Sequence, residues 1–218
     1  DIMGAPSASL NIVVRDELGL SLAKQMEQDF GTPYMSCGLP YGTDGTMAWL
    51  SEIIEKLGAG ELTHASHEAA KLKEFLLRKG NNLESLWGPL WFDAVLISAP
   101  PSEALGIAEA IRSEWIDTAR LCIHAQCETE KSTPAADAIR VVMKNEKEIA
   151  KDYEDWQGGL VLSSSHETHL LRRMGRSFTG FHIALPSHDE VHFSDLPQCG
   201  LRGAGYLYEQ LWNAKLRK

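Results

Sequence analysis

Short apolar runs alternate along the chain with longer amphipathic stretches, and this alternation is the feature that most constrains the fold. The continuous apolar runs at residues 10–14 (LNIVV) and 92–98 (FDAVLIS) are typical of strands buried in a parallel sheet. After the first run, Leu18, Leu22 and Met26 recur at steps of four, as on one face of an amphipathic helix. Strands and helices in alternation, joined by short loops, predict a parallel sheet covered by helices on both faces.

The fold class predicted from this pattern is α/β, with a Rossmann-like four-stranded parallel sheet plus part of a second, similar α/β domain. The four strands are expected at residues 92–98, 120–125, 159–162 and 178–185. A long polar helix is expected at residues 133–156, where Pro134 suits a first helical turn. A closing amphipathic helix at residues 203–218 should pack back against the sheet.

Three regions follow from the spacing of these elements. Residues 1–45 are expected to form a partial α/β unit, the end of a truncated preceding domain, because the chain has no initiator methionine. Residues 46–89 are expected to be a helical connector, in which a helix at 64–79 is closed by Gly80-Asn81-Asn82. Residues 90–218 are expected to form the Rossmann-like carboxy-terminal domain.

Charge and composition exclude some classes of protein. The 218 residues carry 30 acidic and 21 basic side chains, a net charge of -9, which argues against a nucleic-acid partner. No stretch reaches the ~18 consecutive apolar residues of a membrane helix, so no membrane partner is expected. Four scattered cysteines without a C-x-x-C pair argue against a disulfide framework and predict a reduced, cytoplasmic protein.

A ligand of this fold class would lie above the carboxyl ends of the strands. Neither G-x-G-x-x-G nor a P-loop follows any strand, so dinucleotide and nucleoside-triphosphate binding are not supported. The polar residues that the loops bring to this edge are Ser98, Ser102, Ser163, Ser165, His166 and His188. They could bind an anionic or carboxylate-bearing group, or they could be capped and solvated turns, with the serines only capping a helix.

The chain has eight histidines, and some have the spacing of metal ligands. His166 and His169 are three residues apart, and His188 and His192 are four apart, which are spacings that zinc sites use on helices. His188 and His192 fall in a loop that contains Pro, Ser and Asp, and His166 and His169 have no nearby cysteine or third ligand, so solvated positions are expected and no metal ligand is assigned. His182, inside the last strand, could be a satisfied core histidine or could face a cofactor.

The end of the chain resembles a known family. Residues 184–207 (ALPSHDEVHFSDLPQCGLRGAGYL) are similar to the closing segment of nitrogenase component 1 subunits, where a G-F-P-x-x-D-like turn is followed by P-x-x-G-x-x-G. The matching positions are Pro186, Asp189, Pro197, Gly200 and Gly203. Residues 10–35, 39–53, 92–111 and 158–175 resemble further segments of that family, in the right order and closer to its β-type subunits.

The resemblance implies an oxidoreductase subunit whose full-length form has three Rossmann-like domains and holds an iron–sulfur or metal cluster. Such a subunit pairs with a sister subunit and reduces a small molecule or a tetrapyrrole with electrons from an ATP-hydrolysing iron–sulfur reductase. None of the four cysteines matches a cluster ligand of the family, so this chain is expected to hold no metal and to be inactive alone. Were a metal found, Cys122, His124 and Cys127 would be the first ligands to test. Two alternatives remain: a scaffold for metallocluster assembly, and a non-catalytic Rossmann-like binding or interaction paralogue.

Overall fold

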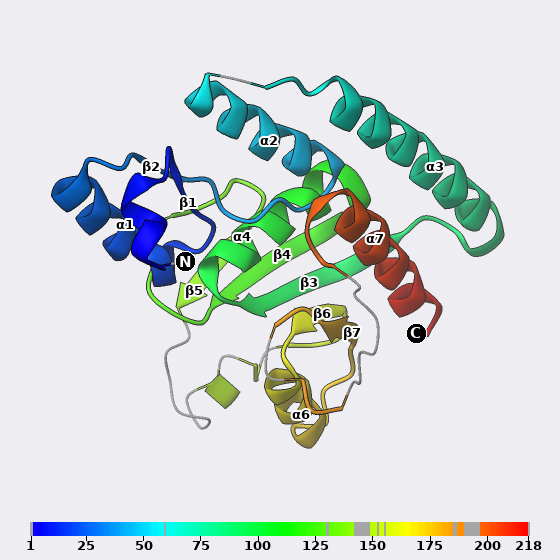
Figure 1. The fold of residues 1–218 in the computed structure, drawn as a ribbon. Coiled ribbons are helices and arrows are strands. Elements are labelled where there is room, and N and C mark those ends of the chain that lie inside the picture. Colours follow the sequence, from blue (N-terminus) through cyan, green and yellow to red (C-terminus); the bar gives the residue numbers. More distant parts are fainter. Residues whose placement is uncertain are drawn as a thin grey trace.

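The computed structural model describes residues 2–58, 60–129, 131–141, 149–151, 153–154, 156–184, 187–189 and 197–217, and its centre is a parallel β-sheet (Figure 1). The strands of this sheet are β3 (Trp91–Ala99), β4 (Asp117–Ala125), β5 (Ala138–Val141), β6 (Leu160–Ser163) and β7 (Thr179–His182). They lie in the order β5-β4-β3-β6-β7, and every neighbouring pair is parallel. The predicted α/β class and the parallel Rossmann-like sheet are therefore confirmed.

The sheet has five strands rather than four, because β5 lies where the sequence pattern predicts a helix at residues 133–156. Asp137 holds the start of β5 against β4, since its carboxylate accepts a hydrogen bond from the Leu121 N–H (2.6 Å). The Asp137 N–H donates in turn to the Leu121 carbonyl (2.8 Å). β5 is an exposed edge strand of only four residues, so its pattern carries little hydrophobic signal. Residues 142–148, 152 and 155 of the predicted helix lie outside the described residues.

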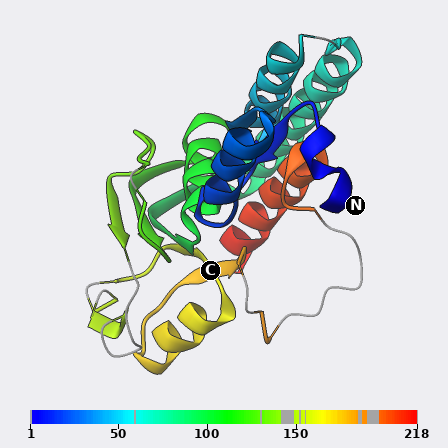
Figure 2. The same cartoon turned by 60° about the vertical axis from the view of Figure 1, so that its left-hand side comes forward.

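Helices cover both faces of the sheet, as Figures 1 and 2 show. On one face lie α4 (Pro101–Ala110), its π-helical extension η2 (Ile111–Trp115) and α7 (Gly200–Leu216), and on the other lies α6 (Ser165–Arg173). Successive side chains of β3 point to opposite faces. Val95 and Ile97 accordingly join the larger core under α4 and α7, whereas Ala94 and Leu96 join the smaller one under α6.

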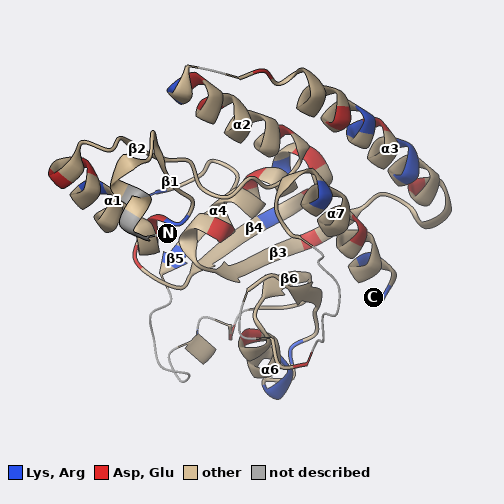
Figure 3. Ribbon diagram, in the orientation of Figure 1, with Lys and Arg blue, Asp and Glu red and all other residues tan. Residues whose placement is uncertain are grey.

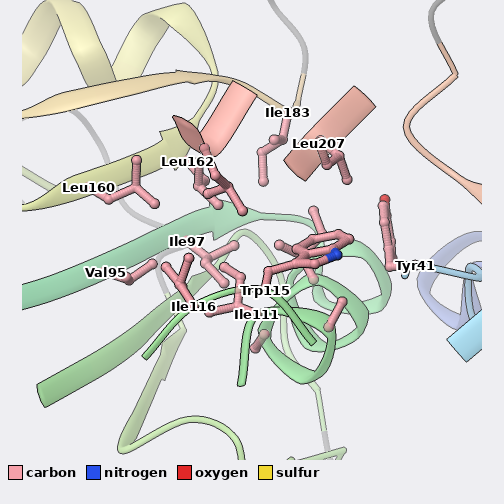
Figure 4. Packing of buried hydrophobic residues seen from close by; sticks show 14 of the residues in the cluster. Tyr41, Val95, Ile97, Ile111, Trp115, Ile116, Leu160, Leu162, Ile183 and Leu207 are labelled. Carbon is pink, nitrogen blue, oxygen red and sulfur yellow. The ribbon is translucent and has the colours of Figure 1, made fainter. Parts of the chain in front are cut away.

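The larger core holds the central strands, α4 and α7 together. Figure 4 shows Val95 and Ile97 of β3 packed between Leu162 of β6 and Ile111, with Leu207 of α7 nearby. All five side chains are at most 2% exposed. Burial of this extent stabilises a fold by about 1.5–3 kcal/mol for each large aliphatic side chain, so these residues dominate the packing of the domain.

A helical hairpin, α2 (Thr43–Leu57) and α3 (Thr63–Trp87), packs outside this core and touches α7. The expectation that Gly80-Asn81-Asn82 closes the second helix is wrong, because α3 continues to Trp87 and is capped by Gly88. Gly80 instead lies against α7: a Cβ at this position would be 2.2 Å from the Tyr208 hydroxyl oxygen. No helix in the described ranges is long and apolar enough to cross a membrane.

The first forty residues form a small unit of their own. After the 3-10 turn η1 (Ile2–Ser7), β1 (Asn11–Val13), α1 (Asp16–Phe30) and β2 (Tyr34–Ser36) make one strand–helix–strand crossover. β1 and β2 pair in parallel with each other and form a sheet separate from the five-stranded one. The first apolar run of the sequence therefore belongs to this small unit and does not join the main sheet.

Gly180 of β7 is predicted to be intolerant of substitution, because a Cβ there would lie 1.9 Å from the Val161 carbonyl oxygen on β6. Gly180→Ala should lower the free energy of unfolding by about 1–3 kcal/mol through overpacking, measured by urea denaturation. Gly205→Ala is the matched control, since its Cβ would meet nothing nearer than the Leu72 side chain at 3.7 Å. A Gly180→Ala variant as stable as the Gly205→Ala variant would contradict the pairing of β6 with β7.

Candidate functional site

The carboxyl ends of the strands meet at one edge of the sheet, where open α/β sheets bind their ligands. β3 is central, with β4 and β5 on one side and β6 and β7 on the other. From β3 the chain adds β4 and β5 on one side of the sheet and then adds β6 and β7 on the other side, so the strand order switches at the junction of β3 and β6. Ser98 lies at the end of β3, and Ser163 lies at the end of β6, on the two sides of this junction.

The junction holds a carboxylate of the chain itself, that of Glu167 from the first turn of α6. Glu167 is 7% exposed. Its Oε1 accepts a hydrogen bond from Gln126 Nε2 (3.2 Å) and lies 3.5 Å from Ser98 Oγ. Its Oε2 accepts from the Ser164 N–H (3.1 Å) and from the Ser164 hydroxyl. One side chain thus joins the ends of β3, β4 and β6, in the position where a ligand of a Rossmann-like domain would approach.

This arrangement is also the amino-terminal cap of α6. The Ser164 hydroxyl accepts a hydrogen bond from the His166 N–H (3.2 Å), and the Glu167 carboxylate accepts one from the Ser164 N–H, which together form a capping box. The positive end of the helix dipole therefore faces the carboxylate of Glu167. An additional anion at this point would be repelled by that carboxylate and would find these helix N–H donors already used.

The structure gathers some of the predicted site residues around α6. Ser98 is buried, and Ser163 and Ser165 are completely buried. The Ser163 hydroxyl donates to the Ser164 carbonyl (3.0 Å), and the Ser165 hydroxyl accepts from the His188 N–H (3.1 Å). These three serines therefore brace the edge from within, while the cap of α6 is Ser164, which lies between two of them in the sequence.

The remaining predicted residues are placed differently. The side chains of His166 and His188 are exposed at the edge. Ser102 lies apart from them, at the junction of α4 with α1, where its hydroxyl donates to Glu17 Oε2 (2.6 Å) and accepts from the Asp16 N–H (3.2 Å). Of the six predicted residues, His166 and His188 are thus the two that are exposed.

A cavity of about 310 Å³ opens beside the edge, and of its lining residues only His182 was weighed from the sequence as a group that could face a ligand. Arg15, just before α1, forms an ion pair there with the buried Glu103 of α4. Gln198 and Ser187 add an amide and a hydroxyl to the wall. The cavity lies between the small amino-terminal unit and the main sheet, so both units contribute polar groups to it.

His182 at the end of β7 is a satisfied core histidine that also lines this cavity. It is 8% exposed, its Nε2 lies 3.2 Å from Thr168 Oγ1, and its Nδ1 lies 3.1 Å from Ser187 Oγ. The Thr168 hydroxyl donates its one proton to the Ser165 carbonyl (3.0 Å), so Nε2 of His182 is the donor in their contact. His182 therefore fixes the loop after β7 to α6.

Asp189 anchors the same loop from outside. Its carboxylate lies 3.4 Å from His182 Nδ1, 3.4 Å from His169 Nε2 and 3.3 Å from Arg172 Nη1. Burial alone would raise the pKa of Asp189, but the nearby His182, Arg172 and His169 outweigh it and hold that pKa below its ordinary value. The ionised carboxylate is therefore favoured in the folded protein. Pro186 of the same family-like turn lies outside the described residues, as does His192.

The cysteines do not fit the cluster that the resemblance implies for the full-length protein. Cys37 follows β2, Cys122 lies within β4, Cys127 follows β4 and Cys199 precedes α7. Burial raises the pKa of each thiol, whereas iron binds the thiolate. Within the described residues, no three His, Cys, Asp or Glu side chains are grouped to hold a metal ion. No chemical step is therefore assigned to a metal in this chain.

Glu167 is predicted to be a structural carboxylate that cannot be replaced by its amide. In Glu167→Gln the amide NH₂ would replace one carboxylate oxygen and face either the donors of Ser164 or that of Gln126, so the free energy of unfolding should fall by about 2 kcal/mol. Glu109→Gln, at an exposed position of α4, is the control and should change stability by less than about 0.5 kcal/mol. Chemical denaturation at neutral pH measures both, and equal stability of the two variants would contradict the bridging role.

The lowered pKa of Asp189 predicts a pH dependence. A carboxyl group whose folded pKa is depressed contributes stability above its unfolded pKa, and this contribution is lost as the pH falls through the folded value. Asp189→Asn should therefore be less stable than the parent protein at pH 7, and the difference should shrink below about pH 4. Asp29→Asn, at an exposed position of α1, is the control. A stability difference that does not change with pH would contradict the electrostatic role.

Comparison with known proteins agrees with this fold. A chain from the solved structure "Nitrogenase Cp1 at pH 6.5" superimposes with a TM-score of 0.70 over 98% of this chain and 46% of the other, at 15% identity. A subunit of the light-independent protochlorophyllide reductase of Chloroherpeton thalassium is 26% identical over 97% of this chain and 42% of its own length. The nitrogenase iron-molybdenum cofactor biosynthesis protein NifE of Clostridium pasteurianum is 36% identical over 39% of this chain and 17% of its own length.

The chain therefore spans less than half the length of these relatives. The family model described as "Nitrogenase component 1 type Oxidoreductase" matches residues 1–216, which is nearly all of the sequence. The match includes both the small amino-terminal unit and the five-stranded sheet. The chain belongs to the family of nitrogenase component 1 type oxidoreductases.

Proposed function

We propose that this chain is part of a nitrogenase-like oxidoreductase subunit that reduces a small molecule or a tetrapyrrole. The observation that carries the proposal is the family match over residues 1–216, together with the shared fold. A relative that aligns with 97% of the chain is a subunit of light-independent protochlorophyllide reductase, which favours a tetrapyrrole as the substrate. The electrons would come from an ATP-hydrolysing iron–sulfur reductase, and a sister subunit would complete the enzyme.

The structure of the small amino-terminal unit supports the proposal that the chain is part of a longer protein with a second α/β domain. Parallel sheets are normally covered on both faces, yet β1 and β2 form only a two-stranded sheet. Leu18 and Leu22 of α1 are 71% and 64% exposed, beside a largely apolar cavity of about 340 Å³. We propose that residues 1–45 complete a preceding domain, that residues 46–89 connect the two, and that residues 90–218 are the carboxy-terminal domain.

In this proposal the carboxyl edge is one wall of a site that another domain completes. His166 and His188 are exposed there and would face the substrate or the other domain, whereas Ser98, Ser163 and Ser165 hold the edge in shape. An imidazole near neutral pH can donate a proton to a reduced substrate. Any iron–sulfur or metal cluster would be held by residues outside this chain.

Ser102 and the cysteines belong to the proposed function, although neither would contact the substrate. Ser102 would act at the junction of α1 and α4, where its hydroxyl bonds to Glu17. The four free cysteines support a reducing, cytoplasmic location.

The alternative is a scaffold on which a metallocluster is assembled, and the similarity to NifE over 39% of the chain is the observation that favours it. A scaffold would transfer a cluster without reducing a substrate. A third alternative, a non-catalytic paralogue, predicts full-length protein that contains no iron after anaerobic purification.

The proposed function is tested with the full-length protein, its sister subunit and the reductase, purified anaerobically. We expect ATP-dependent reduction of the substrate, with protochlorophyllide as the first compound to assay. Cluster transfer without reduction would favour the scaffold, and iron-free protein without activity would favour the paralogue.

The role of the exposed histidines is tested in the same assay. His166→Ala and His188→Ala should lower kcat by about 10²-fold or more if the imidazoles move a proton. His64→Ala, at an exposed position of α3, should leave it unchanged. Full activity of both edge variants would remove this edge from the active site while leaving the family assignment intact.

A further inference from the structure

A groove lies between α2 and α4, on the side of the sheet that α4 and α7 cover (Figure 1). It measures about 690 Å³ and shares no lining residue with the cavity beside the carboxyl edge. One wall is α2 and the other is α4 with η2, and residues from the segments 37–41 and 133–135 complete the lining. Clefts of ~300–1,000 Å³ are typical of binding sites, so this groove has room for side chains of another molecule.

Small residues keep both walls of the groove open. Gly45 and Ala48 line it from α2, and both are exposed. A Cβ placed on Gly45 would meet no atom within 4 Å. Gly106 and Ala110 line the facing wall from α4. A side chain of another molecule can therefore enter the groove without displacing one of the chain's own.

Trp49 gives the groove an anchored aromatic surface. Its Nε1 donates a hydrogen bond to the Gly38 carbonyl (3.1 Å), and the residue is half-buried, so part of it is accessible. Residues three apart are neighbours on a helix surface, and Glu52, three residues after Trp49, lines the same groove. An indole beside a carboxylate suits a guanidinium, which can stack on the ring while its N–H edge pairs with the acid.

Carboxylates line the groove from both walls, and Figure 3 shows acidic residues on both α2 and α4. Two of the carboxylates have partners. Asp44 pairs with Lys73 Nζ (2.7 Å), and Glu114 accepts a hydrogen bond from the Asp44 N–H (3.0 Å) at the start of α2. The carboxylates of Glu52 on α2 and Glu109 on α4 have no hydrogen-bond or ion-pair partner among the described residues, and both residues are exposed. Two negative charges are therefore available to a ligand.

The arginine in the lining does not neutralise these two charges. The three guanidinium nitrogens of Arg112 donate to two backbone carbonyls and to the Asp137 carboxylate (2.9 Å). Burial and the negative charge of Glu52 raise the pKa of the Cys37 thiol, and they outweigh the opposing effect of Lys131. Because Cys37 also lines the groove, the field of Glu52 extends into it.

We propose that this groove is the docking site for an arginine-bearing segment of a partner protein, with a guanidinium on Trp49 and beside Glu52, and with Glu109 on the facing wall. Charge complementarity defines the partner, because two unpaired carboxylates in a largely apolar groove match a basic side chain with apolar neighbours. Arginine fits better than lysine, since its planar group stacks on an aromatic ring and binds a carboxylate through two N–H groups. The proposal does not depend on the reductase function.

The test uses a labelled helical peptide of the length of α2, with leucine along one face and arginine along the other. Fluorescence anisotropy at constant ionic strength should show saturable binding to the chain, weaker binding of the same peptide with lysine for arginine, and none with glutamate for arginine. The double variant Glu52→Gln/Glu109→Gln should weaken binding of the arginine peptide about tenfold or more. Glu55→Gln, at an exposed position of α2 outside the groove, should leave it unchanged.

A steric variant tests the groove without changing its charge. Gly45→Leu should keep the fold, since the new side chain meets open space, and should block the arginine peptide. Ser51→Leu, at an exposed position of α2 outside the groove, is its control.

Three results of the peptide assay would overturn the proposal: an arginine peptide that binds no more tightly than the lysine or glutamate peptide, a Glu55→Gln variant as weak as the groove variants, or a Gly45→Leu variant that binds like the parent protein. Sedimentation of the chain alone adds a fourth. Self-association that Gly45→Leu abolishes would make a second copy of this chain the occupant and would overturn the assignment to a partner protein.

Discussion

The buried carboxylate of Glu167 is the interaction on which the carboxyl edge of this protein depends. It lies where β3, β4 and β6 end. It accepts hydrogen bonds from Gln126, just after β4, and from Ser164, just after β6, and it lies 3.5 Å from the Ser98 hydroxyl of β3. A buried charge needs such partners, because an unpaired one would cost several kcal/mol. The same carboxylate caps α6, so the strand ends and the helix are held by one group.

This constraint determines what the edge can do. In a Rossmann-like domain the helix start next to the central strand is normally available to an anion. Here it is occupied by the chain's own negative charge, and the serines around it are buried. The accessible groups are His166 and His188 at the rim, and the cavity between Arg15, Glu103 and Gln198. The Glu167 carboxylate therefore leaves the rim and this cavity, rather than the junction of β3 and β6, as the open parts of the edge.

Most of the fold could be predicted from the sequence, because burial leaves a periodic signal. The strands β3 and β6 are largely apolar runs, β4 has a shorter apolar stretch around Leu121–Ile123, and several helices carry apolar stripes. The pattern does not predict β5, because a short, exposed edge strand has no such run and its place depends on the hydrogen bond of the Asp137 carboxylate with the Leu121 N–H of β4. The pattern ends α3 too early because Gly80, which looks like a helix end, instead packs against Tyr208 of α7, and no local pattern reveals that contact.

The candidate site was less predictable still, because its polar contacts join distant parts of the chain. The spacing of Ser164 and Glu167 is a capping-box signal, but Ser98 and Gln126 lie 69 and 41 residues away from Glu167, and no local rule connects them.

The junction of β3 and β6 is filled by the Glu167 carboxylate, and we expect no ligand to bind there. A crystal structure of the full-length protein with its bound substrate tests this most directly. We expect the Glu167 carboxylate to remain within hydrogen-bonding distance of the Ser164 N–H and Gln126 Nε2, with the substrate outside the crevice. A substrate or cofactor atom that displaces this carboxylate and bonds to Ser98 or Ser164 would contradict the account.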